Sequence, residues 1–138
     1  MTDEIARFFD AYAEAFSRGD VDAVCGLWAY PAFFVARGRR AALDAGAFRA
    51  NTEAILAAYR RFGAVRAEKR LLAADALFDG LWLVRTADRM IDAMGAEVAA
   101  WEHRYLLSRT EDGLRAVCAM PDGELDAWAA RGTPLGSW

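Results

Sequence analysis

Apolar and polar residues recur with a helical period in the first part of the chain. Before Gly19, apolar side chains lie three and four positions apart and predict one face of an amphipathic helix: Ile5, Phe8, Phe9, Tyr12 and Phe16. Gly19 ends this helix, and Asp20 is placed to cap a second, short helix. The apolar stripe of that helix continues through Val24 to Trp28, and Pro31 ends it.

The next segment predicts a small hairpin and then a third helix. An apolar run at 33–35, a turn at Gly38 and a returning run at 41–43 form the hairpin. Asp44 is a typical N-cap residue for the helix that follows, and Gly63 closes that helix. The apolar stripe of this helix consists of Phe48, Thr52, Ile55, Leu56, Tyr59 and Phe62.

The second half of the chain has the pattern of strands joined by tight turns. Asp79-Gly80 is a strong hairpin signal, and Gly95 and Gly113 mark two further turns. A short helix follows at 124–131. Helices followed by an antiparallel meander predict an α+β fold, in a single domain over residues 1–138. The predicted strands cover 65–78, 81–91, 98–109 and 114–120.

Composition excludes several classes of protein. With 56% hydrophobic and 27% charged residues the chain is globular, and its net charge of −3 argues against a nucleic-acid surface. No apolar run approaches the roughly 18 residues of a membrane span, and the acidic start at 1–4 lacks the basic region of a signal peptide. Two cysteines are too few for a disulfide scaffold. We therefore expect a cytoplasmic protein. All 17 basic residues except Lys69 are arginine, which we interpret as a coding bias.

The order of these elements resembles the nuclear transport factor 2-like superfamily, also called the SnoaL-like or ketosteroid-isomerase-like cone fold. Residues 12–20 are similar to the end of the first helix in ketosteroid isomerases, and residues 109–115 to the polar turn before the last strand. The resemblance covers nearly the whole chain. It implies helices packed in the concave face of a strongly curved antiparallel sheet, an apolar pocket and a homodimer through the outer face. The fold carries isomerases, cyclases, dehydratases and non-catalytic binders, so it does not give the function.

The resemblance also assigns positions to the residues of a ketosteroid isomerase. Tyr12 stands at the tyrosine that donates to the developing enolate, and Tyr105 at the second donor. The general base maps to Ala36, and residues 32–36 contain no carboxylate. Because the proton next to the carbonyl cannot move without a base, ketosteroid isomerase activity is excluded. The simpler explanation, which we prefer, is that Tyr12 is one more residue on the apolar face of its helix.

Strand alternation groups the side chains by face, and the position of Tyr105 in the resemblance implies that its face lines the pocket. Residues 101, 103, 105 and 107 share one face of their strand, and a two-residue loop near Gly95 places 84, 86 and 88 on that same face. A three-residue loop would swap the faces. For the register, we prefer Arg85 opposite Glu102 to Arg85 opposite Arg104, since the first pair is attractive.

These faces define a candidate site. The possible catalytic residues are His103, which is the only histidine, Asp88 as the group that orients it, and Tyr12. The alternative is that His103 packs in a mixed wall and Asp88 is solvated. We assign Cys118 no chemistry, the acidic residues at 122–126 to a helix start, and expect no metal or cofactor. The residues expected to bind ligand are Trp28, Tyr59, Thr86, Trp101, Tyr105, Cys118 and Met120, with Phe48 and Ile55 completing the wall.

Three functions fit these observations. The first is a binding protein that holds a small apolar ligand in the cone. The second is a cofactor-free isomerase, cyclase or dehydratase in which His103 and Asp88 act as acid and base. The third is a dimerisation module without a ligand. A hydrogen bond from His103 to Asp88 that opens on a cavity favours the enzyme, a packed wall between them favours the binder, and a filled cone favours the third.

Overall fold

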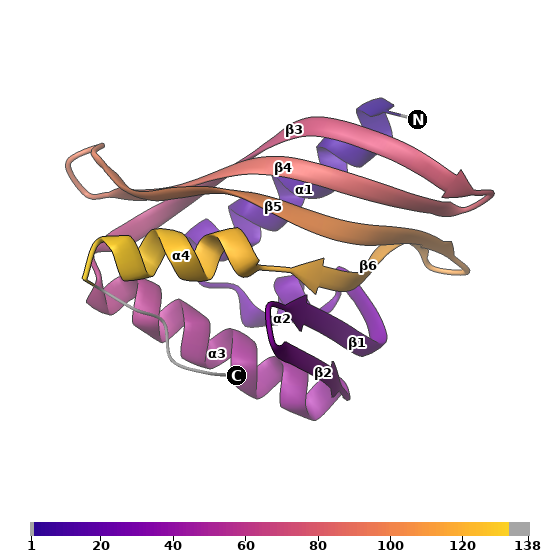
Figure 1. Cartoon of the computed structure of the whole chain (residues 1–138), viewed down its shortest axis with the longest axis horizontal. Coiled ribbons are helices and arrows are strands. Elements are labelled where there is room, and N and C mark those ends of the chain that lie inside the picture. Colours follow the sequence, from indigo (N-terminus) through magenta and orange to yellow (C-terminus); the bar gives the residue numbers. More distant parts are fainter. Residues whose placement is uncertain (1, 133–138) are drawn as a thin grey trace.

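The computed structural model describes residues 2–132, which form four helices and one six-stranded sheet (Figure 1). The long ribbons of β3, β4 and β5 lie side by side, and α4 follows β6 and packs along β5 (Figure 1). In chain order the elements are α1 (Thr2–Arg18), α2 (Val21–Cys25), β1 (Trp28–Ala36), β2 (Arg39–Leu43), α3 (Ala45–Arg61), β3 (Ala64–Phe78), β4 (Leu81–Asp92), β5 (Glu97–Thr110), β6 (Gly113–Met120) and α4 (Asp122–Ala130).

The sheet has the strand order β2-β1-β6-β5-β4-β3. The α+β order and the antiparallel meander from β3 to β6 are confirmed. One pair departs from the expected antiparallel sheet, because β1 and β6 run parallel. These two strands are separated in the chain by β2, α3 and the strands β3 to β5, so no hairpin sets their relative direction.

The helices begin where the sequence predicts. Asp20 accepts a hydrogen bond from the backbone N–H of Ala23 at 3.0 Å, and Asp44 accepts one from Ala47 at 2.8 Å. The prediction for the end of α2 is wrong, since the helix stops at Cys25 and Trp28 already belongs to β1. A short apolar run has no period that separates a helix from a buried strand.

The turn between β4 and β5 differs from the expected two-residue loop. Asp92 N–H donates to the carbonyl of Ala96 at 2.9 Å and closes a three-residue loop with Gly95 at φ 82°. That loop alone would swap the strand faces, but a bulge at Val98 adds one residue and restores them. The predicted faces are therefore confirmed, although the expected loop was wrong.

The preferred register is also wrong. Arg85 lies opposite Arg104. Glu102 lies on the same strand as Arg104, two residues earlier, and its carboxylate is 3.7 Å from Arg85 and 3.9 Å from Arg104. Each of these charged side chains is nearly half exposed, so their pairing contributes little free energy. The register instead places buried side chains opposite one another, Thr86 against His103 and Val84 against Tyr105.

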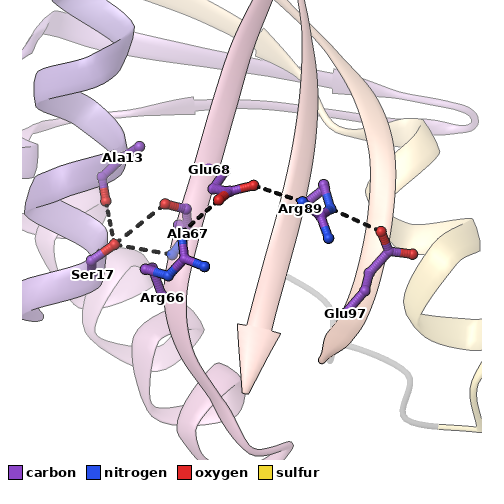
Figure 2. Close-up of polar contacts among 7 residues, drawn as sticks. All are labelled: Ala13, Ser17, Arg66, Ala67, Glu68, Arg89 and Glu97. Atoms are coloured by element: carbon purple, nitrogen blue, oxygen red, sulfur yellow. Dashed lines mark hydrogen bonds and ion pairs between the residues drawn. The ribbon is translucent and has the colours of Figure 1, made fainter. Parts of the chain in front are cut away.

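Helix α1 is attached to the free edge of β3 (Figure 2). Ser17 Oγ donates to the carbonyl of Ala13 at 2.8 Å and accepts the N–H of Ala67 at 3.0 Å. This contact satisfies a backbone donor that has no partner strand on that side. Beyond it, Glu68 and Arg89 belong to a row of surface ion pairs that crosses the sheet (Figure 2).

Two clusters of buried side chains form the core. One gathers Phe9, Tyr12, Trp28 and Tyr105 where α1 meets β1 and β5. The other gathers Tyr59, Trp101 and Trp128 where α3 and α4 meet β5. Within residues 2–132, no helix has the length and hydropathy needed to cross a membrane.

Candidate functional site

A cavity lies between the two core clusters, since residues of both clusters line it. The space open to the centre of a water-sized sphere is about 60 Å³. A single water needs roughly 10–15 Å³ on the same measure, so the cavity can hold something larger than one water. Its aromatic walls are Tyr12, Phe16, Phe34, Phe48, Tyr59, Trp101 and Tyr105.

A buried ion pair forms one polar wall of the cavity. Lys69 Nζ lies 2.5 Å from Asp88 Oδ2 and donates to Tyr105 Oη at 2.6 Å, while Thr86 Oγ1 donates to Asp88 Oδ1 at 2.5 Å. The two charged side chains are 8% and 3% exposed. Burial by itself raises the pKa of Asp88, but the charge of Lys69 and the hydrogen bonds to the carboxylate outweigh it and hold this pKa below its usual range.

Lys69 was missed by the sequence analysis. Two signals point to it. Lys69 is the single lysine among 17 basic residues. It also lies two residues after Ala67 on β3, so both side chains share the strand face that lines the cavity. Its Nζ also lies 4.9 Å from the ring centroid of Tyr12 and 5.1 Å from that of Tyr105, so aromatic faces cover the ammonium group.

His103 lies beside this pair. Its ring stacks on Tyr105 with centroids 4.3 Å apart and planes 8° apart. Nδ1 accepts a hydrogen bond from Trp101 Nε1 at 3.1 Å and lies 3.6 Å from Asp88 Oδ2, which is too far for a hydrogen bond. Among the described residues, Nε2 of His103 is the only buried side-chain nitrogen or oxygen without a hydrogen-bond partner.

The expected pair of His103 and Asp88 is thus brought together, but Asp88 is not bonded to His103. Both oxygens of Asp88 are engaged by Lys69 and Thr86, and His103 is held by Trp101. No packed wall separates the two side chains either, since both line the cavity. The arrangement therefore has neither the His103–Asp88 hydrogen bond expected of an enzyme nor the packed wall expected of a binding protein.

A buried carboxyl group faces the cavity from the other side. Glu124 of α4 is 5% exposed, and its Oε2 accepts hydrogen bonds from Tyr59 Oη and, at 3.2 Å, from Trp128 Nε1. Burial raises the pKa of this carboxyl group, and the hydrogen bond from Tyr59 and the charge of Lys69 only partly oppose the effect. The acidic residues at 122–126 do begin a helix as predicted, but Glu124 also belongs to the cavity. Its spacing of four residues from Trp128 was the available signal.

The residues predicted for the site fall into two groups, those that line the cavity and those that do not. The cavity is lined by Tyr12, Tyr59, Asp88, Trp101, His103 and Tyr105, and not by Trp28, Thr86, Cys118 or Met120. Trp28 and Thr86 are buried behind the wall, where they donate to Tyr12 and Asp88. A bulge at Val117 turns β6 over, so Cys118 lies opposite the outward-facing Leu106 and Ala119 faces the cavity instead.

Cys118 therefore does not face inward as expected, and burial raises the pKa of its thiol. Within residues 2–132, no three His, Cys, Asp or Glu side chains gather in a way that could hold a metal ion.

The buried ion pair yields the first prediction. Replacing Lys69 by Met leaves the Asp88 carboxylate buried without its cation, and we expect a loss of about 3–5 kcal/mol in the free energy of unfolding. The control is Arg85→Met, which breaks a half-exposed pair with Glu102 and should cost about 0–1 kcal/mol. Urea denaturation measures both. Equal losses in the two variants would contradict a stabilising role of the buried pair.

Glu124 yields a prediction about pH. Its pKa is raised on folding above the ordinary 4.5, so its contribution to stability is present below the unfolded pKa and is lost as the pH rises through the folded pKa. Glu124→Gln keeps the carbonyl acceptor and cannot ionise. We therefore expect this variant to gain stability relative to wild type as the pH rises from 4.5 towards neutrality, measured by urea denaturation across that range. Asp126→Asn, on the exposed side of α4, reports the effect of losing a surface charge. A stability difference that does not grow with pH would contradict the prediction.

Solved structures share this architecture at low sequence identity. An NTF2-like protein with a cystatin-like fold from Novosphingobium aromaticivorans is 21% identical, with a TM-score of 0.66 over 93% of this chain and 86% of that one. A ketosteroid isomerase-like protein from Erwinia carotovora atroseptica is 19% identical, with a TM-score of 0.62 over 83% and 88% of the two chains. A domain of unknown function with a cystatin-like fold from Nostoc punctiforme is 15% identical, with a TM-score of 0.67 over 86% and 74%.

These likenesses show the cone fold that the order of elements predicted. No curated protein matches the chain at a significant level. A family model, described as NTF2-like protein (DUF6841), matches residues 3–124, which include every polar residue of the cavity named above. The chain therefore belongs to the NTF2-like protein family DUF6841.

Proposed function

We propose that this chain is a small-molecule binding protein that holds a mainly apolar ligand in the cavity. The observation that carries the proposal is a partly open space of about 60 Å³ between the two core clusters, walled by aromatic rings. Ligand sites in proteins are concave and mainly apolar, with a few polar groups. An apolar ligand in this space would gain contacts with the aromatic walls.

The cavity also bears on the two other functions. A dimerisation module without a ligand has no use for an internal space, so the cavity supports binding over that function. An isomerase, cyclase or dehydratase that used His103 as a base with Asp88 behind it would need an Asp88 hydrogen bond at Nδ1. In the observed arrangement Nδ1 accepts from Trp101 instead, which supports binding over acid–base catalysis.

We further propose that the chain forms a homodimer through the outer face of the sheet. On that face Leu83 and Leu106 lie opposite each other and are half-buried, surrounded by half-exposed charges such as Arg104. We expect sedimentation velocity to give twice the chain mass at micromolar concentration for wild type. The Leu106→Glu variant should sediment with the mass of a single chain. Leu77→Glu, at the exposed end of β3, is the control and should remain dimeric. A single-chain mass for wild type would contradict the dimer.

Ligand binding is tested with two small probes of the same shape, acetophenone and α-methylstyrene. We expect saturation-transfer NMR to detect binding of at least one probe to wild type. Ile55→Trp should abolish it, because Ile55 lines the cavity and the larger side chain fills it. Ala54→Trp places the same side chain on the exposed face of α3 and should bind as wild type does. Absence of binding by both probes, or equal binding by Ile55→Trp, would contradict the proposed cavity site.

A further inference from the structure

One carboxyl oxygen of the cavity has no partner. Oε2 of Glu124 accepts from Tyr59 Oη and Trp128 Nε1, whereas Oε1 makes no hydrogen bond within residues 2–132. Protein atoms do not enclose Oε1 as they enclose Nε2 of His103, and Glu124 lines the cavity, so a ligand there can contact this oxygen. From this, and resting on the proposed binding function, we infer that the ligand is an amine that binds in its protonated form, with an N–H that donates to Oε1 of Glu124.

The carboxyl group of Glu124 is held in place by contacts on both sides. A Cβ atom at Gly123 would lie 2.9 Å from the carbonyl oxygen of Glu102, so a larger residue there would push the first turn of α4 away from β5. The rings of Tyr59 and Trp128 stack with centroids 5.4 Å apart, and both side chains donate to Oε2. Oε1 is therefore the oxygen that is left for a ligand.

The two donors on Oε2 also decide where the carboxyl proton lies. They occupy both lone pairs of Oε2, so a neutral Glu124 carries its proton on Oε1. An uncharged amine takes this proton, and a charged amine binds as the proton leaves to solvent. Both routes end in the same ion pair of an ammonium group and a carboxylate. A hydroxyl group is too weak a base to take the proton, and it forms only an uncharged hydrogen bond, which is the weaker kind.

The charges that line the cavity leave Glu124 without a cation. Lys69 is bound to Asp88 at 2.5 Å, and Nδ1 of His103 also lies beside Asp88, at 3.6 Å. Glu68 pairs with arginines on the outer surface. An ionised Glu124 therefore depends on a ligand for its counter-charge. The titratable groups that share the cavity with it are Tyr12 of α1, Tyr59 of α3, Glu68 and Lys69 of β3, Asp88 of β4, and His103 and Tyr105 of β5.

Aromatic rings surround the space beside Glu124. Phe16 and Tyr59 line the cavity with their ring centroids 6.0 Å apart. Trp101 lines it too, and its Cβ would lie 3.7 Å from a Cβ at Gly123, next to Glu124. The faces of aromatic rings attract cations, and the rings also bury hydrocarbon. An ammonium group on an apolar body therefore gains contacts here that an uncharged compound does not.

The inference is tested with three probes of the same shape: benzylamine, benzyl alcohol and ethylbenzene. They carry an ammonium, a hydroxyl and a methyl group at the same position. We expect NMR titration near neutral pH to show that wild type binds benzylamine about tenfold more tightly than ethylbenzene, as a charge-assisted hydrogen bond predicts. Benzyl alcohol should bind more weakly than benzylamine. Equal or tighter binding of the alcohol overturns the inference.

A variant identifies the oxygen that receives the amine. Glu124→Gln cannot ionise, so it should bind benzylamine no more tightly than ethylbenzene. Retained binding of ethylbenzene confirms that the cavity is intact, and a thermal melt confirms that the variant is folded. Asp126→Asn loses a carboxylate on the exposed side of α4 and should keep the preference for the amine. A preference that survives in Glu124→Gln overturns the inference.

The pH dependence of binding gives an independent readout. Burial raises the pKa of Glu124 above the ordinary 4.5 in the free protein, and a bound ammonium group lowers it again. The affinity for benzylamine should therefore rise as the pH rises from 4.5 towards neutrality, whereas the affinity for ethylbenzene stays constant. Calorimetry in buffers of different ionisation enthalpy should detect the proton that Glu124 releases. A constant affinity for benzylamine overturns the inference.

The outcomes separate this inference from the proposed function. If none of the three probes binds, the binding function itself is wrong. If all three bind wild type equally, the binding function stands and the amine inference is overturned.

Discussion

The buried ion pair between Lys69 and Asp88 is the contact on which the cavity depends. A single buried carboxylate in an aromatic core would be neutralised or expelled, since the cost of removing its charge from water is several kcal/mol. Lys69 supplies the opposite charge at 2.5 Å and also bonds to Tyr105, on which His103 stacks. One interaction therefore stabilises the carboxylate and positions the tyrosine.

Two bulges decide which side chains meet around this pair. Val98 is the extra residue in β5 and keeps Trp101, His103 and Tyr105 on the inner face. Val117 is the extra residue in β6 and turns Cys118 outward, so that the smaller Ala119 faces the cavity. A shorter side chain at that position leaves space beside Tyr105. The shape of the cavity thus depends on single-residue irregularities in two strands.

The polar groups of the cavity come from three separate parts of the chain. Lys69 lies on β3 at the sheet edge, Asp88 and His103 on the central strands, and Glu124 on the last helix. Helix α1 holds the edge strand through Ser17 (Figure 2). The same helix places Tyr12 against the cavity. A substitution that loosens α1 or α4 is therefore expected to change the cavity as well as the stability of the fold.

The sequence by itself determined most of the elements and the alternation of side chains along each long strand. Several signals act over only a few residues and can be recognised from the sequence alone. They are the helical spacing from Ile5 to Phe16, the caps Asp20 and Asp44, and the turn at Gly80. Strand alternation likewise placed His103 and Tyr105 on one face of β5, and both line the cavity.

Only the tertiary structure decided how those residues are partnered. Lys69 reaches Asp88 and Tyr105 through the register of the long strands, and Glu124 reaches Tyr59 through the docking of α4. Such contacts depend on burial across the whole sheet, where exposed pairs such as Arg85 and Glu102 contribute too little free energy to set the register. The choice of partner between separate elements is a long-range property, and local spacing in the sequence does not fix it.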